Sequence, residues 1–166
     1  MKLNIIIVFA IITIGVAVYA YTNQSPPQKA FEKNPALDFS TITLNGEPLT
    51  LSQFEGQKIY LHFWATWCAP CIVEIPEIVK FAENSENIVV AIAVENKPDD
   101  VKNFLENIDL NIAENFIIGL DPDWQIAREL YGSRKLPETF IISSDFHVER
   151  HIIGSWDKWE EAHLLQ

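Results

Sequence analysis

The chain has 166 residues, of which 48% are hydrophobic, and it carries a formal net charge of -11. This length and composition fit one globular domain with a sizeable buried core. The negative charge argues against nucleic-acid binding, which needs a basic surface, but it identifies no partner because acidic domains are often simply soluble.

Residues 1–21 begin with one basic residue, Lys2, which is followed by an almost wholly apolar run from residue 3 to residue 21. About eighteen or more apolar residues can cross a bilayer as a helix. The segment therefore predicts an uncleaved signal anchor, which its length favours, or a signal peptide cleaved after Ala20. In both cases the positive amino-terminal end indicates that the rest of the chain lies outside the cytoplasm.

Residues 22–36 follow as a polar segment that contains Pro26 and Pro27. Consecutive prolines favour an extended backbone, so this segment is expected to be a tether between the N-terminal segment and the domain. The folded domain is expected to cover residues 37–166.

The first elements of the domain are a hairpin and a strand that leads into a helix. Residues 38–51 alternate between apolar and polar side chains on either side of Asn45-Gly46, a dipeptide that strongly favours a hairpin turn. Residues 59–64 are apolar and rich in β-forming side chains, and residues 70–81 repeat apolar side chains with the period of a helix. This stretch predicts a strand that ends directly before a helix.

The rest of the domain alternates between strands and helices. Residues 88–94 form a continuous apolar strand, as in a sheet that is covered on both faces. The alternation indicates an α/β fold, with a central sheet, helices on both faces and a closing antiparallel pair. The later elements are expected to be a helix at 98–108, a strand at 116–120, a helix at 124–131, strands at 138–143 and 147–154, and a last helix at 157–165.

The only two cysteines, Cys68 and Cys71, lie between the strand at 59–64 and the helix that follows. Their C-x-x-C spacing lets a disulfide close within one helical turn. The first sulfur then lies at the helix N-terminus, where unpaired N–H groups and the helix dipole favour a thiolate. Since the thiolate is the species that attacks disulfides, the motif indicates a thiol–disulfide oxidoreductase with Cys68 as nucleophile and Cys71 as resolving thiol.

Three other uses of the cysteines remain open. A structural zinc site needs four ligands, and no second cysteine pair exists, while His147 and His151 are expected on a strand pair, where they do not converge. A structural disulfide that closes so short a loop would stabilise the fold only weakly. A copper chaperone would need a third soft or imidazole ligand near the pair, and the only methionine is Met1.

The sequence resembles the membrane-tethered TlpA/ResA/CcmG-like thioredoxins of cytochrome c maturation, over about residue 37 to the C-terminus. The resemblance implies the thioredoxin fold: a central mixed β-sheet with helices on both faces, an N-terminal hairpin and a central strand–helix insert. It rests on four features, which are the run Phe63-Trp64-Ala65-Thr66-Trp67-Cys68-Ala69-Pro70-Cys71, Glu74 with Pro76, the run Leu136-Pro137-Glu138-Thr139-Phe140, and the insert between the two runs.

The resemblance also assigns a substrate-binding surface around the sulfurs. Leu136 and Pro137 match the cis-proline loop of the family, in which the backbone before the proline pairs with a substrate strand, as in β-augmentation. Trp67 is expected to form a flat apolar surface beside Cys68. The family tunes its reduction potential at the two residues between the cysteines, here Ala69 and Pro70.

Two further residues are candidates for moving protons. Glu74 lies one helical turn beyond Cys71, where the family has an acid, and partial burial would raise its pKa so that it could take the proton of Cys71. His62 departs from the family, which has an acid or an amide at that position. It is expected to be either a neutral core residue or a proton relay to Cys71.

The resemblance implies a reductase on the periplasmic or extracytoplasmic side, tethered by the N-terminal helix, that reduces the C-x-x-C-H haem-attachment site of apocytochrome c or other envelope proteins. A membrane-embedded thiol reductant would restore its dithiol, since no further cysteine is present. No metal or other cofactor is expected beyond the redox-active disulfide Cys68–Cys71. A disulfide-forming oxidant is the alternative within the same chemistry. A peroxidase would carry its reactive cysteine alone in a different loop.

Overall fold

The computed structural model describes residues 10–19, 31–95, 97–108 and 112–164. Residues 10–19 form a helix with exposed side chains. Within the described residues, no helix combines the length and the hydropathy needed to cross a bilayer. The predicted N-terminal anchor lies partly outside the described residues, and so does the greater part of the tether.

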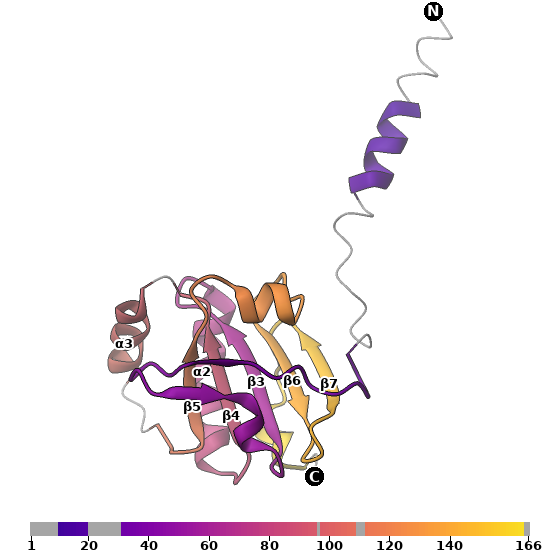
Figure 1. The fold of residues 1–166 in the computed structure, drawn as a ribbon. Helices are drawn as coiled ribbons and strands as arrows, with labels where there is room; N and C mark the ends of the chain where they lie inside the picture. The colour runs from indigo at the N-terminus through magenta and orange to yellow at the C-terminus, as the bar shows by residue number, and fades with distance from the viewer. Residues whose placement is uncertain (1–9, 20–30, 96, 109–111, 165–166) are drawn as a thin grey trace, which may run out of the picture.

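Five strands form the central sheet, in the order β5-β4-β3-β6-β7 (Figure 1). β3 is parallel to β4, β4 is parallel to β5, and β3 pairs antiparallel with β6, which pairs antiparallel with β7. The sheet is therefore mixed, as predicted. Its strands are β3 (Ile59–Trp64), β4 (Ile88–Ala93), β5 (Phe116–Leu120), β6 (Glu138–Ile142) and β7 (Val148–Ile153).

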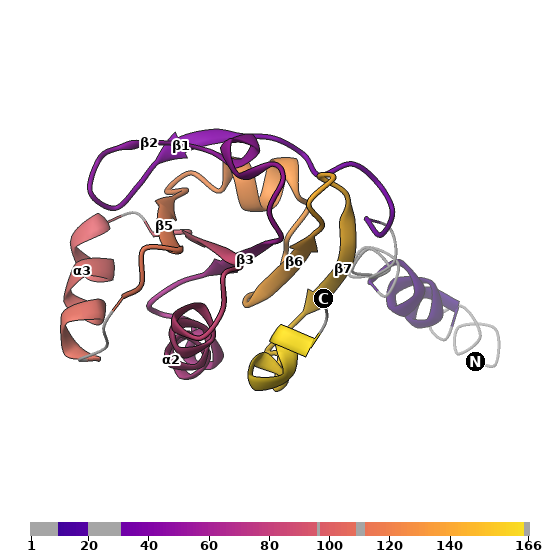
Figure 2. The ribbon, with the colours of Figure 1, turned by 90° about the horizontal axis from the view of Figure 1, so that it is seen from below.

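Successive residues of β3 pack against different layers, because side chains alternate between the faces of a strand. On one face the ring of Tyr60 meets Phe81 of α2 (Ala69–Glu83), and Trp64 meets Phe104 of α3 (Pro98–Asn107). On the other face Phe63 packs against Tyr131. Figure 2 shows α2 and the C-terminal turn on the opposite side of the sheet from the hairpin.

The hairpin lies against the edge strand β5. It consists of β1 (Ser40–Ile42) and β2 (Pro48–Thr50), which form a separate two-stranded antiparallel sheet around the predicted turn at Gly46. Gly119 of β5 allows this close approach, since a Cβ there would come within 2.6 Å of Ile92 Cδ1 and 2.8 Å of Leu49 Cδ2. The expected hairpin and strand–helix insert are both present.

Two of the expected helices are not regular α-helices. Residues 125–130 form a π-helix, η3 (Gln125–Leu130), that begins after a left-handed residue, Trp124. The last helix was predicted from residue 157, but it is a 3₁₀-helix, η4 (Trp159–Leu164). Its start is fixed by tertiary contacts, because the backbone N–H of Trp156 and the indole N–H of Trp159 both donate to the carboxylate of Glu74.

The last residues of the predicted tether lie along β7. The N–H of Lys33 donates to the carbonyl of Val148, and the N–H of Val148 donates to the carbonyl of Asn34. The ring of Phe31 packs edge-on against Phe140 and His151, with centroids 5.3 Å apart in both cases. Residues 31–36 are thus tied to the sheet by backbone hydrogen bonds and by an aromatic contact.

Candidate active site

The two cysteines form a disulfide at the start of α2. Cys68 is the N-cap residue of α2 and Cys71 lies in its first turn, as predicted. The side chain of Cys71 is fully buried, whereas Cys68 retains 7% exposure and is flanked by exposed Trp67, Ala69 and Pro70. Cys68 is therefore the sulfur that a second molecule can approach, and the helix N-terminus can stabilise its thiolate.

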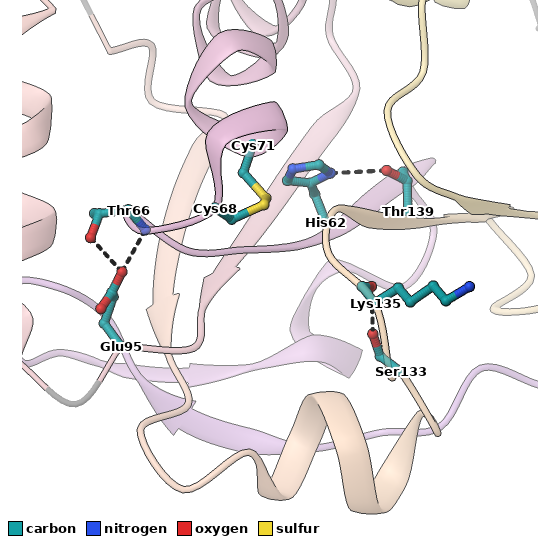
Figure 3. Close-up of a disulfide and its surroundings, with 8 residues drawn as sticks. All are labelled: His62, Thr66, Cys68, Cys71, Glu95, Ser133, Lys135 and Thr139. Carbon is teal, nitrogen blue, oxygen red and sulfur yellow. Dashed lines mark hydrogen bonds between the residues drawn. A yellow bond between two sulfur atoms is a disulfide. The ribbon is translucent and has the colours of Figure 1, made fainter. Parts of the chain in front are cut away.

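A buried carboxylate fixes the loop that carries Cys68. Oε1 of Glu95 accepts hydrogen bonds from the backbone N–H of Thr66 at 2.5 Å and from its hydroxyl at 2.6 Å (Figure 3). Glu95 follows β4, which pairs with β3 up to Trp64, so the two strand ends bring it to the cysteine loop. Glu95 is not among the site residues that the sequence predicts. The only signal was a charged side chain directly after an apolar strand.

The predicted cis-proline is present at Leu136–Pro137. Phe63 of β3 pairs with Glu138 of β6, so the proline directly before Glu138 lies level with the end of β3, where the cysteine loop begins. The carbonyl of Pro137 accepts a hydrogen bond from Gly154 at 2.9 Å, and Leu136 is half-buried. The sheet register therefore brings the proline loop and the disulfide to the same edge of the fold.

A buried polar cluster holds both ends of the proline loop. The carboxylate of Glu138 is hydrogen-bonded through Oε2 to the hydroxyl of Ser133 and through Oε1 to Nε2 of His151. All three residues are at most 3% exposed. Phe140 stacks on the His151 ring at 4.1 Å between centroids. Both oxygens of a buried carboxylate thus have partners, which is the arrangement that makes its burial tolerable.

His62 lies on the α2 face of β3, and Figure 3 shows its ring directed toward the disulfide. Nδ1 and the hydroxyl of Thr139 are 2.9 Å apart, while Nε2 has no hydrogen-bond partner among the residues that the structure describes. Burial lowers the pKa of His62 to about 3, because it removes the imidazolium from water. The imidazole is therefore neutral at physiological pH, and His62 supplies no positive charge to a thiolate.

Glu74 is buried one turn beyond Cys71, and its two oxygens differ. Oε1 accepts from the backbone N–H of Trp156 at 2.9 Å and from Nε1 of Trp159 at 2.6 Å, while no described residue donates a hydrogen bond to Oε2. Burial raises the pKa of this carboxyl, and the hydrogen bonds from Trp159 and Trp156 oppose the shift. Neither tryptophan is predicted at the site from the sequence, since both lie more than 80 residues away along the chain.

The structure thus brings the predicted site residues to one edge of the sheet. Cys68, Cys71 and Glu74 share the first two turns of α2, and the β3–β6 pairing adds His62 and the proline loop. Among the described residues, no group of three or more histidine, cysteine or acidic side chains is placed to hold a metal ion.

A buried and an accessible sulfur at a helix N-terminus, with a cis-proline loop at the same sheet edge, define the thioredoxin-fold class of thiol–disulfide oxidoreductases. Comparisons with known proteins agree. A sequence profile of the AhpC/TSA family matches residues 33–151. The thiol-disulfide oxidoreductase ResA of Bacillus thuringiensis subsp. konkukian is 32% identical over 134 residues, which are 79% of this chain and 75% of that protein.

In two further comparisons, the alignment covers almost the whole length of at least one of the two proteins. ResA of Halalkalibacterium halodurans is 32% identical over 99% of this chain and 92% of its own length. A crystal structure from Chlorobium tepidum, assigned as a thiol:disulfide interchange protein DsbE, superposes with a TM-score of 0.70 at 27% identity, covering 81% of this chain and 95% of that one.

The chain belongs to the AhpC/TSA family and, within it, to the TlpA/ResA/CcmG-like thioredoxins. The protein is accordingly a thiol–disulfide oxidoreductase with the redox-active disulfide Cys68–Cys71.

Proposed function

We propose that the protein is an extracytoplasmic protein-disulfide reductase, and that its substrate is the C-x-x-C-H disulfide of apocytochrome c. The observation that carries the proposal is the pair of sulfurs at the start of α2, of which Cys68 is accessible and Cys71 is buried. The resemblance to cytochrome c maturation thioredoxins supports the direction and the substrate.

The reaction is two successive thiol–disulfide exchanges. The Cys68 thiolate bonds to one substrate sulfur, the substrate S–S bond breaks, and the departing sulfur takes a proton. The Cys71 thiolate then attacks Sγ of Cys68, the mixed disulfide breaks, and the second substrate thiol leaves with a proton. The substrate gains two electrons and two protons, and Cys68 and Cys71 end as the disulfide.

Glu74 is proposed as the base that takes the proton from Cys71 before the second exchange. It lies one turn beyond Cys71 on α2, where positions i and i+3 share a face. Burial raises its pKa, and Oε2 accepts no hydrogen bond within the described part of the chain. A base whose pKa approaches the working pH accepts a thiol proton more effectively than an ordinary carboxylate. Nε2 of His62, which has no hydrogen-bond partner among the described residues, is proposed to pass on the same proton without holding it, because burial keeps the pKa of His62 near 3.

The substrate is proposed to bind as an extended segment across the proline loop. Leu136 offers its backbone to the substrate strand, Pro137 adds no competing N–H, and Trp67, Ala69 and Pro70 surround Cys68 with exposed surface. Oxidised protein is then restored by a membrane-embedded dithiol reductant, without a metal or another bound cofactor.

The location is proposed from the N-terminal segment. The apolar run behind Lys2 tethers the domain to the outer face of the cytoplasmic membrane. The alignment with ResA of Halalkalibacterium halodurans covers 99% of this chain, so that protein has a matching N-terminal segment.

The test is a Cys71→Ser variant expressed in its native membrane, followed by mass spectrometry of whatever becomes disulfide-linked to Cys68. Without the resolving thiol the protein stalls at the mixed disulfide. Apocytochrome c is the expected adduct, and the double variant Cys68→Ser/Cys71→Ser is the control without adduct. Other envelope proteins as adducts would keep the reductase chemistry and replace the substrate. The absence of any adduct despite a reactive Cys68 would contradict the proposal.

A further inference from the structure

Trp124 has a backbone conformation that a bulky side chain rarely adopts. Its φ of 58° and ψ of 22° lie in the left-handed region, which costs energy for residues with a Cβ and is usual for glycine. Neighbouring contacts hold it there. The carboxylate of buried Asp121 accepts hydrogen bonds from the N–H groups of Ile126 and Ala127. Such a conformation persists only where the surroundings enforce it, and it is often found at functional sites.

This conformation places the indole of Trp124 beside the nucleophile. The ring stacks on Trp67, with centroids 6.2 Å apart and planes 29° apart, and Trp67 directly precedes Cys68. The guanidinium of Arg128 lies 4.7 Å from the centroid of the Trp124 ring. Arg128 is on the π-helix η3, and its backbone N–H donates to the carbonyl of Trp124 at 3.0 Å, which keeps the two residues together. Trp67, Trp124 and Arg128 form one continuous stack, here called the aromatic platform.

The platform is open to solvent, although the exposure of aromatic rings to water costs free energy. Trp67 is 62% exposed, Trp124 is half-buried and Arg128 is exposed. A large apolar ring is seldom left in water without a binding role when it belongs to a contiguous patch. In this case the patch is continuous with the surface around Cys68, so a molecule that reacts with Cys68 meets it.

We propose that the aromatic platform docks the polypeptide segment that flanks the substrate disulfide. In this arrangement Trp124 is a positioning residue that holds Trp67, an aromatic or apolar substrate side chain packs on Trp67, and a substrate carboxylate binds Arg128. The inference rests on the reductase function proposed above and specifies the class of substrate that this site selects.

The charges near the platform favour an acidic segment. Arg128 has no ion pair among the described residues, and neither has Arg134 or Lys135, which are exposed and lead to the proline loop. Exposed Asp123 directly precedes Trp124, so the cation that the platform itself offers is Arg128, whose guanidinium lies 4.7 Å from the centroid of the Trp124 ring. This exposed guanidinium complements a carboxylate on the bound segment.

The test compares Trp124→Gly with Lys33→Gly in the full chain. Glycine suits a left-handed position, so Trp124→Gly removes the indole without disturbing the backbone. Lys33 is a matched control because it also has a positive φ, 69°, is exposed, and pairs with Val148 at the opposite end of the sheet. A third variant, Arg128→Gln, removes the cation alone.

Reduced protein is mixed with three disulfides under single-turnover conditions. Two are synthetic peptides with an internal C-x-x-C disulfide flanked by phenylalanine and either aspartate or lysine, and the third is hydroxyethyl disulfide. We expect Trp124→Gly to weaken binding of the aspartate peptide about ten-fold, as for an interface hot spot, with an unchanged limiting rate. The loss with hydroxyethyl disulfide should be at least about five-fold smaller. Arg128→Gln should abolish the preference for aspartate over lysine.

Two results would overturn the inference while leaving the reductase function intact. Trp124→Gly could match Lys33→Gly with the aspartate peptide, or it could lose equal activity with the peptide and with hydroxyethyl disulfide, which would indicate a structural role. Wild-type protein that reduces neither peptide would instead contradict the reductase function, and the inference with it.

Discussion

Two buried sets of histidine and glutamate lie on opposite faces of the sheet, and they differ in how completely they are hydrogen-bonded. On one face, Glu138 has partners for both oxygens and pairs with His151. On the face that carries α2, neither Nε2 of His62 nor Oε2 of Glu74 has a hydrogen-bond partner among the described residues. Buried polar atoms usually have hydrogen-bond partners, so titratable atoms without a partner that lie beside a redox disulfide are candidates for proton transfer. The contrast suggests that one set holds the proline loop and the other exchanges protons.

Removing one member of the fully hydrogen-bonded set, Glu138 and His151, should have the largest effect on stability. We expect His151→Ala to lower the free energy of unfolding by about 3–5 kcal/mol, because it leaves Glu138 buried without its partner. Denaturant unfolding measures the loss. The matched control is His147→Ala, which removes a solvent-exposed pair with Asp145 and should leave the free energy of unfolding nearly unchanged, because water screens such a pair. Equal losses in the two variants would remove the distinction between a structural pair and a surface pair.

On the redox face, Glu74→Gln should change kinetics more than stability. Glutamine keeps an oxygen that can accept from Trp156 and Trp159, so the fold is retained. Without a base, we expect the second exchange to slow about 100-fold. Rapid quenching followed by quantification of the mixed disulfide measures that step. An unchanged rate would remove Glu74 from the mechanism, and a collapsed fold would place it with Glu138 as a structural residue.

His62 should make the fold sensitive to acid. Its pKa is about 3 in the folded protein and 6.5 in the unfolded chain, so the unfolded chain binds more protons between these values. Stability should therefore rise with pH from about 3 to 6.5, by at most about 1.4 kcal/mol per pH unit. We expect His62→Gln, which can still bond Thr139, to flatten this slope. Denaturant midpoints measured across this pH range give the comparison, and identical profiles would contradict a buried neutral imidazole.

Glu74 should give a smaller slope of opposite sign. Its folded pKa lies above the ordinary value of 4.5, so the folded protein holds the proton more tightly. Its contribution to stability is complete below pH 4.5 and is lost as pH rises through the folded pKa. In the His62→Gln variant, the fall in the free energy of unfolding with rising pH should become visible. The double variant His62→Gln/Glu74→Gln should lack this fall. If the double variant keeps the same downward slope, other carboxyls are responsible for it.

Local patterns of the sequence predicted the sheet and the redox motif. The apolar run at 59–64, the C-x-x-C pair and the helical period after it depend on neighbours in the chain, and the structure confirms all three. The cis bond at Pro137 came from resemblance, because X-Pro sequences alone do not show the isomer.

The partners of the buried polar groups could not be predicted in this way. Glu74 meets Trp156 and Trp159 across more than 80 residues, and Glu95 reaches Thr66 across 29. Such contacts arise from the packing of whole elements, and no short sequence pattern encodes them. The left-handed backbone of Trp124 is likewise imposed by tertiary contacts, since the residue type opposes it.

The most direct test of the central claim is the reduction of Cys68–Cys71 by dithiothreitol in the folded protein. Alkylation and mass spectrometry would follow each thiol, and circular dichroism would follow the fold. We predict reduction without unfolding, with Cys68 alkylated before buried Cys71. Reduction that occurs only in denaturant, or only as fast as the protein unfolds, would identify a structural disulfide and contradict the account.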